Sequence, residues 1–288
     1  MSHFHSINGN FVAEADATIH ASDITFRRGF GAFDYLRLYE GVPLFMEDHL
    51  ARFERTAEIL GIDMLMSRSA LTEHVLELIA KNGQETAGLQ LFLTGGYAED
   101  GFTPTTPNLV ILQNPLPHVP QEKYDQGAKL ISHEYTRDLP EAKTTNYMMA
   151  VVLGKTMRAA GATDALYYSS DTIFETTRSN FFVVDADGAI ITPREGILYG
   201  ITRKHILQVA HEHATVVERR LTWDDLKNAK EAFITSTTKG ALPIVQIDDM
   251  KVGSGVPGEV AKTLMTHFEA HRQAYLEEFR NKYNAVAS

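Results

Sequence analysis

Lys143 stands in the stretch "PEAKTTNYMMAVVLGK", just ahead of an apolar segment that predicts a helix. Lysine side chains are rarely buried, so a solvated surface cation is the simplest interpretation. A primary amine can instead act as a covalent nucleophile when its surroundings keep part of it unprotonated near neutral pH. The other reactive residues of the chain decide between these two interpretations.

Four further features suit an anionic ligand or a ring nitrogen. Glu175 lies in "IFETTRSNFFVV", a run of β-forming residues that predicts one strand. Gly200, Ile201 and Thr202 precede a predicted helix, whose first N–H groups and positive dipole end favour an anion. "ITSTTKG" predicts a strand that ends in a Ser/Thr/Gly loop able to bind phosphate oxygens. "EDHLARFERTAEIL" places Arg52 in the first turns of a helix.

Each feature also has a simpler explanation. A Gly-Ile-Thr sequence is commonly a plain helix cap, and Ser/Thr clusters commonly form turns. Arg52 suits a solvated helix surface, and Glu175 suits an ion pair with Arg178. The combination of the features and their order along the chain favour a shared ligand.

The elements that must position these residues fall into two predicted domains. Residues 1–115 predict a mixed α/β domain, with tight turns at Asn8-Gly9 and Glu40-Gly41. The proline-rich stretch that follows predicts an interdomain linker over residues 116–127. Residues 128–288 predict a second domain of short strands and three helices.

The helix after Lys143 is expected to have Asn146 as its N-cap and to end at Gly161. Four of its apolar residues are expected to face a core: Met149, Val152, Leu153 and Ala160.

Composition limits the classes of function. The 288 residues carry 44% hydrophobic and 22% charged residues, which is ordinary for a globular protein. A formal net charge of −10 argues against nucleic-acid or anionic-membrane partners, because both need a positive field. The absence of cysteine excludes disulfides and thiolate chemistry and fits a reducing compartment. No signal peptide or membrane span is expected, so we predict a cytoplasmic protein.

Taken in order, the motifs resemble those of the fold-type IV pyridoxal-phosphate (PLP) enzymes: branched-chain aminotransferases, D-amino acid aminotransferases and aminodeoxychorismate lyases. The resemblance runs along nearly the whole chain, through "FDYLRLYEG", "HLARF", "KTTNY", "ETTRSNFF", "GITR" and "TSTTKG". It implies an α/β (α+β) fold with a smaller N-terminal domain, a larger C-terminal domain with a β-barrel-like core, and the cofactor at the domain interface. It also implies pyridoxal 5′-phosphate as cofactor and a homodimer in which the neighbouring subunit completes the site.

The resemblance also implies roles for individual residues. Lys143 matches the lysine that forms a Schiff base with PLP, and Glu175 matches the acid that contacts the pyridine nitrogen. Tyr147 resembles the tyrosine near the cofactor's phenolic oxygen, at a spacing that varies within the family. The expected phosphate cup consists of Arg52, the backbone of Ile201 and Thr202, and Thr237 and Thr238.

These residue types suit that chemistry. Partial burial beside cations lowers a lysine pKa and so leaves a nucleophilic amine. A carboxylate about 4 Å from the ring nitrogen contributes roughly 4 kcal/mol at a dielectric of about 20. This equals about 3 pKa units and keeps the pyridinium charged, as an electron sink requires. A phosphate of about −1.5 to −2 charges is matched by one arginine and helix-start N–H groups. Once released by substrate, Lys143 can move the proton between Cα and the cofactor's C4′.

The expected substrate residues include an unusual number of cations. Tyr35 stands where the branched-chain motif Phe-Glu-Gly-Ile-Arg-x-Tyr has glycine, which should shrink or reshape the side-chain pocket. It alternates with Phe33 and Arg37 onto one face of a strand. Arg178 resembles a divergent D-amino acid aminotransferase subgroup, in which arginines hold the substrate carboxylate. The candidate substrate residues are Arg28, Tyr35, Arg37, Arg178 and Lys239, with Arg28 supplied by the neighbouring subunit.

One departure bears on the substrate. The better-known D-amino acid enzymes carry an arginine and a histidine after an "LTGG"-like strand, and "GGYAEDGFTP" has neither. For each candidate cation, a surface salt bridge of little energetic value is the alternative.

We therefore predict a PLP-dependent transaminase that moves an amino group between D-amino acids, such as D-alanine or D-glutamate, and 2-oxo acids by a ping-pong Schiff-base mechanism. The alternatives are an L-branched-chain aminotransferase, then an aminodeoxychorismate lyase. A catalytically silent PLP-binding protein is disfavoured because Lys143 and Glu175 are both present. No metal is expected, because carboxylates do not complete a site at any of three histidine pairs: His3/His5, His211/His213 and His267/His271.

Overall fold

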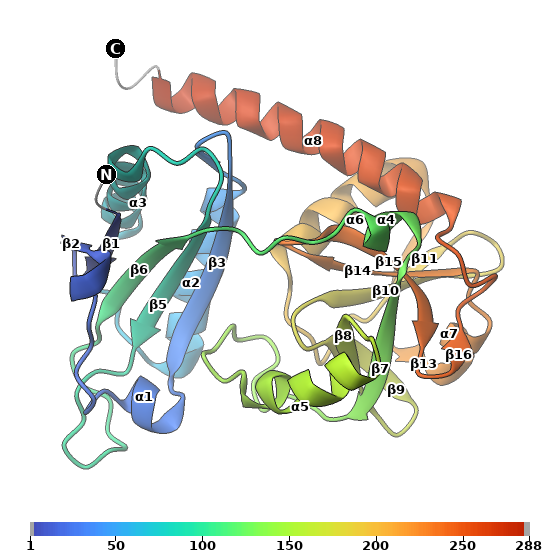
Figure 1. The fold of residues 1–288 in the computed structure, drawn as a ribbon, viewed down its shortest axis with the longest axis horizontal. Helices are drawn as coiled ribbons and strands as arrows, with labels where there is room; N and C mark the ends of the chain where they lie inside the picture. The colour runs from blue at the N-terminus through green and yellow to red at the C-terminus, as the bar shows by residue number, and fades with distance from the viewer. Residues whose placement is uncertain (1–2, 285–288) are drawn as a thin grey trace. The chain divides into compact units, whose positions relative to one another are not determined.

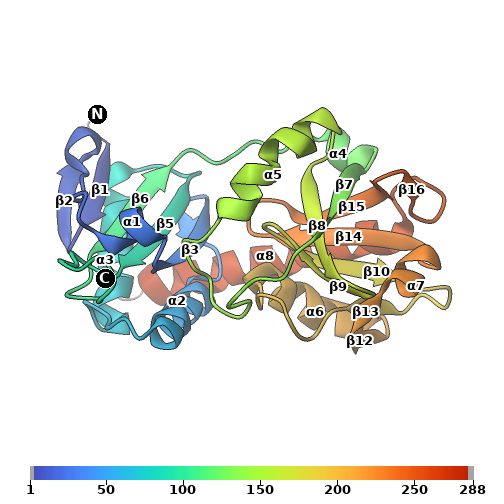
Figure 2. The ribbon, with the colours of Figure 1, turned by 90° about the horizontal axis from the view of Figure 1, so that it is seen from below.

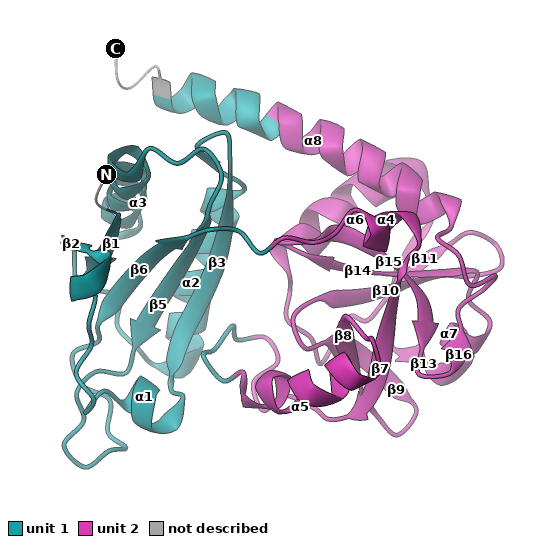
Figure 3. Ribbon diagram, in the orientation of Figure 1, with its two compact units in different colours: residues 1–117, 142–146, 275–288 teal, residues 118–141, 147–274 magenta. Residues whose placement is uncertain are grey.

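The computed structural model describes residues 3–284 of the chain and contains two compact units (Figure 3). The first unit consists of Met1–Pro117, Ala142–Asn146 and Tyr275–Ser288. The second consists of His118–Glu141 and Tyr147–Ala274. The segment around Lys143 therefore joins the first unit, although the chain on both sides of it belongs to the second. The division into domains 1–115 and 128–288 with a linker at 116–127 stays a prediction.

The first unit is built on a six-stranded antiparallel sheet with strand order β2-β1-β6-β5-β3-β4 (Figure 1). Its strands are β1 (Phe4–Ile7), β2 (Asn10–Ala13), β3 (Gly31–Tyr39), β4 (Val42–Pro43), β5 (Gly88–Thr94) and β6 (Leu109–Asn114). Both predicted tight turns are confirmed. Asn8 and Gly9 join β1 to β2, and Glu40 and Gly41 join β3 to β4, all with positive φ, the conformation that two-residue hairpin turns require.

The unit also contains α1 (Ile24–Arg28), α2 (Met46–Leu60), α3 (Arg68–Asn82), a short 3-10 helix (Glu14–Asp16) and the end of α8, described below. α2 packs against β3 and buries Leu50, Phe53 and Ala57, which recur at helical spacing. It ends at Gly61, whose φ of 66° is the left-handed conformation that glycine adopts without a steric penalty. Because α2 lies on β3, a side chain on the inner face of either element can reach the other.

The second unit contains a closed ring of six strands, β10-β14-β15-β7-β8-β9, because β9 pairs with both β8 and β10 (Figure 2). These strands are β7 (Ala128–Glu134), β8 (Asp164–Ser169), β9 (Thr172–Thr176), β10 (Asn180–Val184), β14 (Glu231–Ser236) and β15 (Gly240–Ile247). All six contribute to one apolar core, which includes Leu130, Leu166, Ile173, Phe181, Ile234 and Leu242. The predicted barrel-like core is therefore confirmed.

Shorter elements surround the ring. The strands are β11 (Ile190–Thr192), β12 (Val216–Glu218), β13 (Leu221–Thr222) and β16 (Met250–Lys251). The helices are α4 (Glu122–Asp125), α5 (Met148–Ala159), α6 (Ile201–His213) and α7 (Trp223–Lys227). α6 packs against β14, and α5 packs against β8. In α8 (Glu259–Asn284), residues 259–274 belong to this unit and residues 275–284 to the first.

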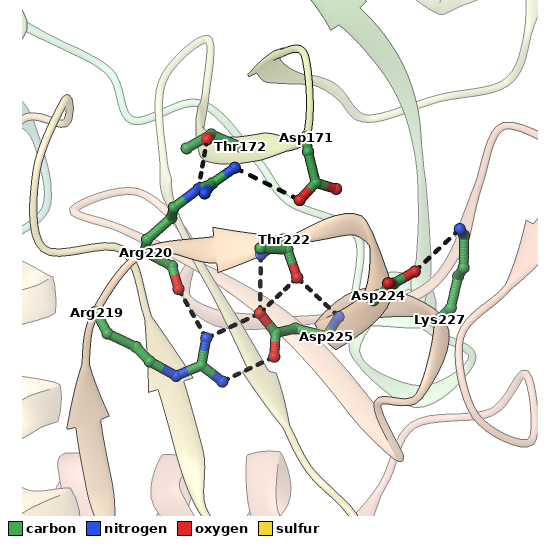
Figure 4. A network of polar contacts seen from close by, with 8 residues as sticks. All are labelled: Asp171, Thr172, Arg219, Arg220, Thr222, Asp224, Asp225 and Lys227. Atoms are coloured by element: carbon green, nitrogen blue, oxygen red, sulfur yellow. Dashed lines mark hydrogen bonds and ion pairs between the residues drawn. The ribbon is translucent and has the colours of Figure 1, made fainter.

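A polar network joins β9, β13 and α7 (Figure 4). Thr222 and Asp225 form a capping box at the start of α7, a motif whose cap contributes about 1 kcal/mol. Arg219 donates to both carboxylate oxygens of Asp225, at 2.8 and 2.7 Å, and lowers the pKa of that group to about 2. Arg220 Nε donates to Thr172 Oγ1 at 2.8 Å. The network therefore links the short strand β13 to β9 of the ring.

Three expectations about local structure are wrong. The predicted single strand around Glu175 is a hairpin, in which β9 and β10 are joined by a tight turn at residues 177–179. The N-cap of α5 is Tyr147 rather than Asn146. Val152 of α5 is 64% exposed, whereas Leu153 and Met157 are buried. The helix packs through a narrower apolar face than its sequence suggests.

Within residues 3–284, no helix is both long enough and apolar enough to cross a membrane.

Candidate active site

The segment that carries Lys143 lies along an edge of β3. Phe33 N donates to Lys143 O at 2.8 Å, and Thr145 N donates to Gly31 O at 2.9 Å. Ala32 and Thr144 form an antiparallel bridge between these two hydrogen bonds. The backbone of residues 143–145 therefore has the fixed position of a short added strand.

Lys143 is also tied to α2. Its backbone N–H donates to Thr56 Oγ1 at 3.1 Å, and Thr56 is fully buried. Its ammonium lies 5.0 Å from the centroid of the Phe33 ring, on the face of β3 opposite the core. A strand and a helix thus fix the origin of this side chain, while its amine lies at a partly exposed position.

Arg52, predicted to bind phosphate, is held by a buried acid that sequence reasoning missed. Arg52 Nε donates to Asp34 Oδ2 and Arg52 Nη2 to Asp34 Oδ1, both at 2.8 Å. Asp34 is 0% exposed and also lies 2.7 Å from His49 Nδ1. One signal was available in the sequence: Asp34 is the single acid among the alternate β3 residues that face α2, which are Ala32, Asp34, Leu36 and Leu38.

The charges of this cluster balance. Burial raises the pKa of Asp34, but the positive charge of Arg52 and the contact with His49 outweigh it and hold that pKa well below its usual range. Burial lowers the pKa of His49 more than Asp34 raises it. A neutral His49 that donates from Nδ1 to Asp34 satisfies both groups. The cluster then has one negative and one positive charge.

The candidate substrate residues of the first unit lie on β3 and α1. Tyr35 and Arg37 alternate with the buried positions of β3, as expected. The Tyr35 hydroxyl lies against Gly88, where an added Cβ would be 2.1 Å away. This hydroxyl is buried without a hydrogen-bond partner among residues 3–284, and burial raises its pKa. Arg28 is exposed at the end of α1, with its guanidinium 4.6 Å from the Phe102 ring centroid.

In the second unit, Glu175 is the penultimate residue of β9, and its carboxylate contacts three groups. Oε1 lies 3.1 Å from Arg137 Nε. Oε2 accepts from Asn180 Nδ2 and from Leu198 N, both at 3.2 Å. Glu175 is 3% exposed, so a basic partner is needed to keep it charged. Its ion pair is thus with Arg137, whereas the sequence had offered Arg178.

Arg137 was not identified from the sequence because it lies in a loop without a motif. Its Nη2 donates to Thr177 O at 2.8 Å, and its guanidinium lies 5.9 Å from the Tyr147 ring centroid. Arg178, at the turn between β9 and β10, is exposed. Arg137 therefore joins Glu175, the hairpin turn and the expected cofactor tyrosine in one group.

The predicted anion-binding elements are the start of α6 and the loop between β14 and β15. Gly200 is the N-cap of α6 and has no side-chain cap, so the backbone N–H groups of Ile201 and Thr202 begin the helix. A Cβ at Gly200 would lie 2.2 Å from Asn180 Oδ1, which explains glycine there. Thr237 and Thr238 lie between β14 and β15, and Thr238 Oγ1 is 3.4 Å from Ser236 Oγ.

Lys239 is buried beneath the β9–β10 turn rather than exposed. It is 8% exposed, its Nζ donates to Ser179 Oγ at 3.3 Å, and it lies 3.9 Å from Asp164 Oδ2. Burial lowers its pKa. Asp164 also accepts hydrogen bonds from the hydroxyls of Thr176 and Thr177. Through its hydrogen bond to Ser179, Lys239 thus stabilises the turn that carries Arg178.

The two units each contain part of the predicted site. The first holds Arg28, Tyr35, Arg37, Arg52 and Lys143; the second holds Tyr147, Glu175, Arg178, Ile201, Thr202, Thr237, Thr238 and Lys239. The donor set fits a phosphorylated pyridine aldehyde: an amine, an oriented guanidinium, a helix start with open N–H groups, and a buried charged carboxylate. Neither group contains a cysteine or another thiolate ligand.

Comparisons with known proteins identify the family. The family model described as amino-transferase class IV matches residues 31–247. A D-alanine aminotransferase of Bacillus licheniformis is 29% identical over 265 residues, covering 90% of this chain and 93% of the relative. A putative branched-chain-amino-acid aminotransferase of Methanocaldococcus jannaschii is 30% identical over 272 residues, covering 91% and 94%. The crystal structure of the branched-chain amino acid aminotransferase of Escherichia coli superposes with a TM-score of 0.87, at 24% identity, covering 94% of this chain and 95% of that one.

Proposed function

Because this chain belongs to the class IV aminotransferases, we propose that it moves an amino group between D-amino acids, such as D-alanine or D-glutamate, and 2-oxo acids in a ping-pong reaction. Pyridoxal 5′-phosphate is the cofactor that accompanies this family, and a branched-chain aminotransferase of the same fold was solved with pyridoxamine 5′-phosphate. When bound, the cofactor supplies an electron sink for negative charge at the substrate Cα.

One observation carries the proposal: Lys143 and Arg52 both belong to the first unit and are held by the same strand and helix, β3 and α2. Lys143 is bonded through its backbone to β3 and α2, and Arg52 of α2 is bonded to Asp34 of β3. A covalent amine and a phosphate ligand at fixed separation are what a phosphorylated aldehyde cofactor needs. A lysine that served only as a surface cation would not need its backbone bonded to both β3 and α2.

The other residues then have defined tasks. Arg52, the α6 backbone at Ile201 and Thr202, and the hydroxyls of Thr237 and Thr238 bind the phosphate. The Glu175 carboxylate accepts the hydrogen bond of the protonated ring nitrogen, and Tyr147 binds the phenolic oxygen. Lys143 Nζ holds the aldehyde carbon and later carries the proton between Cα and C4′.

The preference for D-amino acids rests on the relatives and on β3. Besides the Bacillus licheniformis protein, a D-alanine aminotransferase of Staphylococcus epidermidis is 30% identical over 276 residues. The Tyr35 ring covers Gly88 and so takes up room that a large apolar substrate side chain would use. Arg37, on the same face, and the exposed Arg178 and Arg28 are suited to a substrate carboxylate. In this proposal Lys239 does not contact the substrate itself. It acts through the β9–β10 turn, which it supports and which carries Arg178.

An L-branched-chain aminotransferase is the second candidate, favoured by the relative of Methanocaldococcus jannaschii. The two differ in the hand of the amino acid that reacts. Mixing holoenzyme separately with D-alanine and L-leucine, and recording the absorbance of the bound cofactor, distinguishes them. Loss of the starting absorbance with L-leucine and not with D-alanine would reject the D-amino acid proposal.

The covalent role of Lys143 is tested by Lys143→Ala, with Lys251→Ala at an exposed position of β16 as the matched control. We expect Lys143→Ala to lose the borohydride-reducible adduct and to turn over at least about 100-fold more slowly. Lys251→Ala should behave as wild type. A full adduct and full turnover in Lys143→Ala would show that another amine holds the cofactor.

We also propose a cytoplasmic homodimer whose sites are completed by Arg28 of the neighbouring subunit. Met148, Val151 and Val152 support a dimer, because they are 68%, 76% and 64% exposed on one side of α5. Exposed apolar residues at i, i+3 and i+4 form a continuous stripe, and such stripes mark protein contacts. The absence of cysteine fits a reducing compartment.

A further inference from the structure

Asp34 has no task in the proposed reaction, yet it is among the most constrained side chains in the first unit. It is 0% exposed and accepts from Arg52 twice, from His49, and from the backbone N–H of Tyr35 at 2.7 Å. Oδ1 takes three of these contacts and Oδ2 takes the fourth, all from protein groups. The complete burial of the carboxylate therefore closes it to a ligand.

The geometry of the Arg52 contact fixes which face of the guanidinium is presented. Asp34 takes Nε and Nη2 in the bidentate arrangement, which is planar and more specific in direction than a single hydrogen bond. Three N–H donors of the guanidinium remain, two on Nη1 and one on Nη2, and those on Nη1 point away from Asp34. An arginine on a free helix surface would sample many rotamers and lose this entropy on binding an anion.

The charges of the cluster indicate that Asp34 affects the orientation of Arg52 rather than the net electrostatic attraction for a phosphate. With Asp34 and Arg52 paired and His49 neutral, the cluster contributes little net charge to a bound phosphate. Its value for an anion is then the fixed direction of the donors, which costs no reorganisation on binding. Asp34 lies next to Phe33, the residue that donates to Lys143 O, so the same strand sets the positions of the guanidinium and the amine.

We infer that Asp34 is a positioning residue for Arg52, the arginine proposed to bind the cofactor's phosphate. Asp34 holds the Arg52 guanidinium in the orientation that binds the phosphate and at a fixed position relative to Lys143. This inference rests on the proposed function, because it assigns a task within the same cofactor site.

The test compares two aldehydes that differ only in the phosphate. Apoprotein is titrated with pyridoxal 5′-phosphate and with pyridoxal, and dissociation constants are taken from the absorbance change on reaction with Lys143. The variants are Asp34→Asn, which keeps the shape and removes the charge, and Asp34→Glu, which keeps the charge. Asp23→Asn is the matched control, since Asp23 is also 0% exposed, in the same unit, and caps α1.

We expect Asp34→Asn to weaken pyridoxal 5′-phosphate about 10- to 100-fold, the range seen when the partner behind a ligand-binding side chain is lost. Pyridoxal binding should change by less than about twofold, because pyridoxal makes no use of Arg52. Asp34→Glu should regain most of the preference for the phosphate, and Asp23→Asn should keep the wild-type ratio. Arg52→Gln should abolish the preference, and Asp34→Asn should then have no further effect on it.

The outcomes distinguish this inference from the proposed function. A preference for the phosphate that survives in Asp34→Asn, or a loss of both aldehydes to the same extent, overturns the role of Asp34 alone. Equal affinity of the wild type for both aldehydes overturns the phosphate site and this inference with it. If Asp34→Asn does not fold alone, the double variant Asp34→Asn/Arg52→Gln, which removes both charges, is compared with Arg52→Gln. A wild-type phosphate preference in the double variant overturns the inference.

Discussion

Asp34 and Glu175 are two buried acids with different tasks, and each is paired with one arginine. Asp34 holds Arg52 through two hydrogen bonds at 2.8 Å and is fully buried, so no ligand reaches it. Glu175 instead has one oxygen 3.1 Å from Arg137 and shares the other between Asn180 and Leu198. Under the proposed function, the first pair orients a phosphate ligand and the second holds the acid that accepts from the ring nitrogen.

Arg137 should stabilise the fold through Glu175. Replacing Arg137 by Gln removes the basic partner of a carboxylate that is 3% exposed, and breaking a buried pair costs about 3 kcal/mol or more. We expect Arg137→Gln to lower the free energy of unfolding by about 3 kcal/mol, measured by urea denaturation near pH 7. Adding Glu175→Gln should restore part of this loss, because the unpaired charge is then gone.

An exposed pair provides the matched control for Arg137. Arg55 and Glu58 form an i,i+3 ion pair on α2, with side chains 62% and 71% exposed. Arg55→Gln should change stability by no more than about 0.5 kcal/mol. Equal losses in Arg137→Gln and Arg55→Gln would mean that burial does not strengthen the Glu175 pair.

His49 should make the fold less stable in mild acid. Its pKa is lowered in the folded state by burial, so below the unfolded value of about 6.5 the unfolded chain binds the proton first. Stability is therefore present above that pH and is lost as the pH falls toward the folded pKa. For a fall from about pH 7.5 to about pH 5.5 the loss has an upper limit of about 1.4 kcal/mol, reached when the folded histidine takes up no proton in this range.

The measurement for His49 is urea denaturation at both pH values for wild type and His49→Gln. The variant should lose less stability than wild type across the interval, by at most about 1.4 kcal/mol. His118→Gln, at an exposed position, should keep the wild-type dependence. An unchanged dependence in His49→Gln would show that His49 is protonated in the folded cluster.

At the scale of single residues, sequence reasoning identified the groups with motifs and missed their partners. Lys143, Arg52 and Glu175 lie in recognisable stretches, whereas Asp34 and Arg137 are defined by contacts across 18 and 38 positions. The side-chain partner of a buried charge depends on which strand and helix meet. Periodicity predicts each element alone, so it does not predict such a pairing. Lys239 illustrates the same limit, because its burial follows from the position of the β9–β10 turn.

At the scale of elements, the start of α6 and the β9–β10 hairpin depend on each other. Asn180 begins β10 and donates from Nδ2 to Glu175 Oε2 and to Leu198 O, at 3.2 and 2.7 Å. The backbone of Gly200 lies directly against its Oδ1. The helix start expected to bind phosphate and the carboxylate expected to bind the ring nitrogen therefore share one asparagine as support.

Gly200→Ala should disturb both groups. Its Cβ would lie 2.2 Å from Asn180 Oδ1, so Asn180 must move and withdraw its donor from Glu175. We expect the free energy of unfolding to fall by about 1 to 3 kcal/mol, the cost of overpacking a well-filled site. The affinity for pyridoxal 5′-phosphate should fall as well, measured by titration of apoprotein.

Gly154 offers a matched substitution in a helix without such a contact. A Cβ there would have Arg158 Nη1, at 3.5 Å, as its nearest neighbour. Gly154→Ala in α5 should therefore raise stability by about 0.5 to 1 kcal/mol, since alanine costs less backbone entropy in a helix. A stable, tightly binding Gly200→Ala protein would show that the α6 start tolerates a side chain.

Elements were easier to predict than the turns between them. The turns at Asn8-Gly9 and Glu40-Gly41 followed from glycine, which supplies a positive φ. The turn after Glu175 has no glycine or proline in "ETTRSN", and its stretch of β-forming residues therefore reads as one strand. It is closed by the side chain of Thr176, whose hydroxyl contacts Ser179 N and O at 3.0 and 3.1 Å. Such a local side-chain link has a weak sequence signature.

At the scale of the whole molecule, the proposed dimer can be tested by subunit complementation. If Arg28 serves the neighbouring site, a mixture of Lys143→Ala and Arg28→Ala chains regains activity. Random re-association gives half mixed dimers, and in each of these one site combines Lys143 of one chain with Arg28 of the other. About a quarter of wild-type turnover should return, whereas either variant alone stays far below it.

The exposed stripe of α5 provides the control for this experiment. Placing Val151→Glu and Val152→Glu in both chains buries charges in the proposed contact, which costs several kcal/mol and should prevent complementation. Val256→Glu changes a valine that is 62% exposed outside that stripe and should leave complementation intact. Light scattering reports the dimer directly in each case. Recovery in the α5 double variant would place the subunit contact elsewhere. A mixture of wild-type mass that regains no activity would mean that Arg28 acts within its own subunit or not at all.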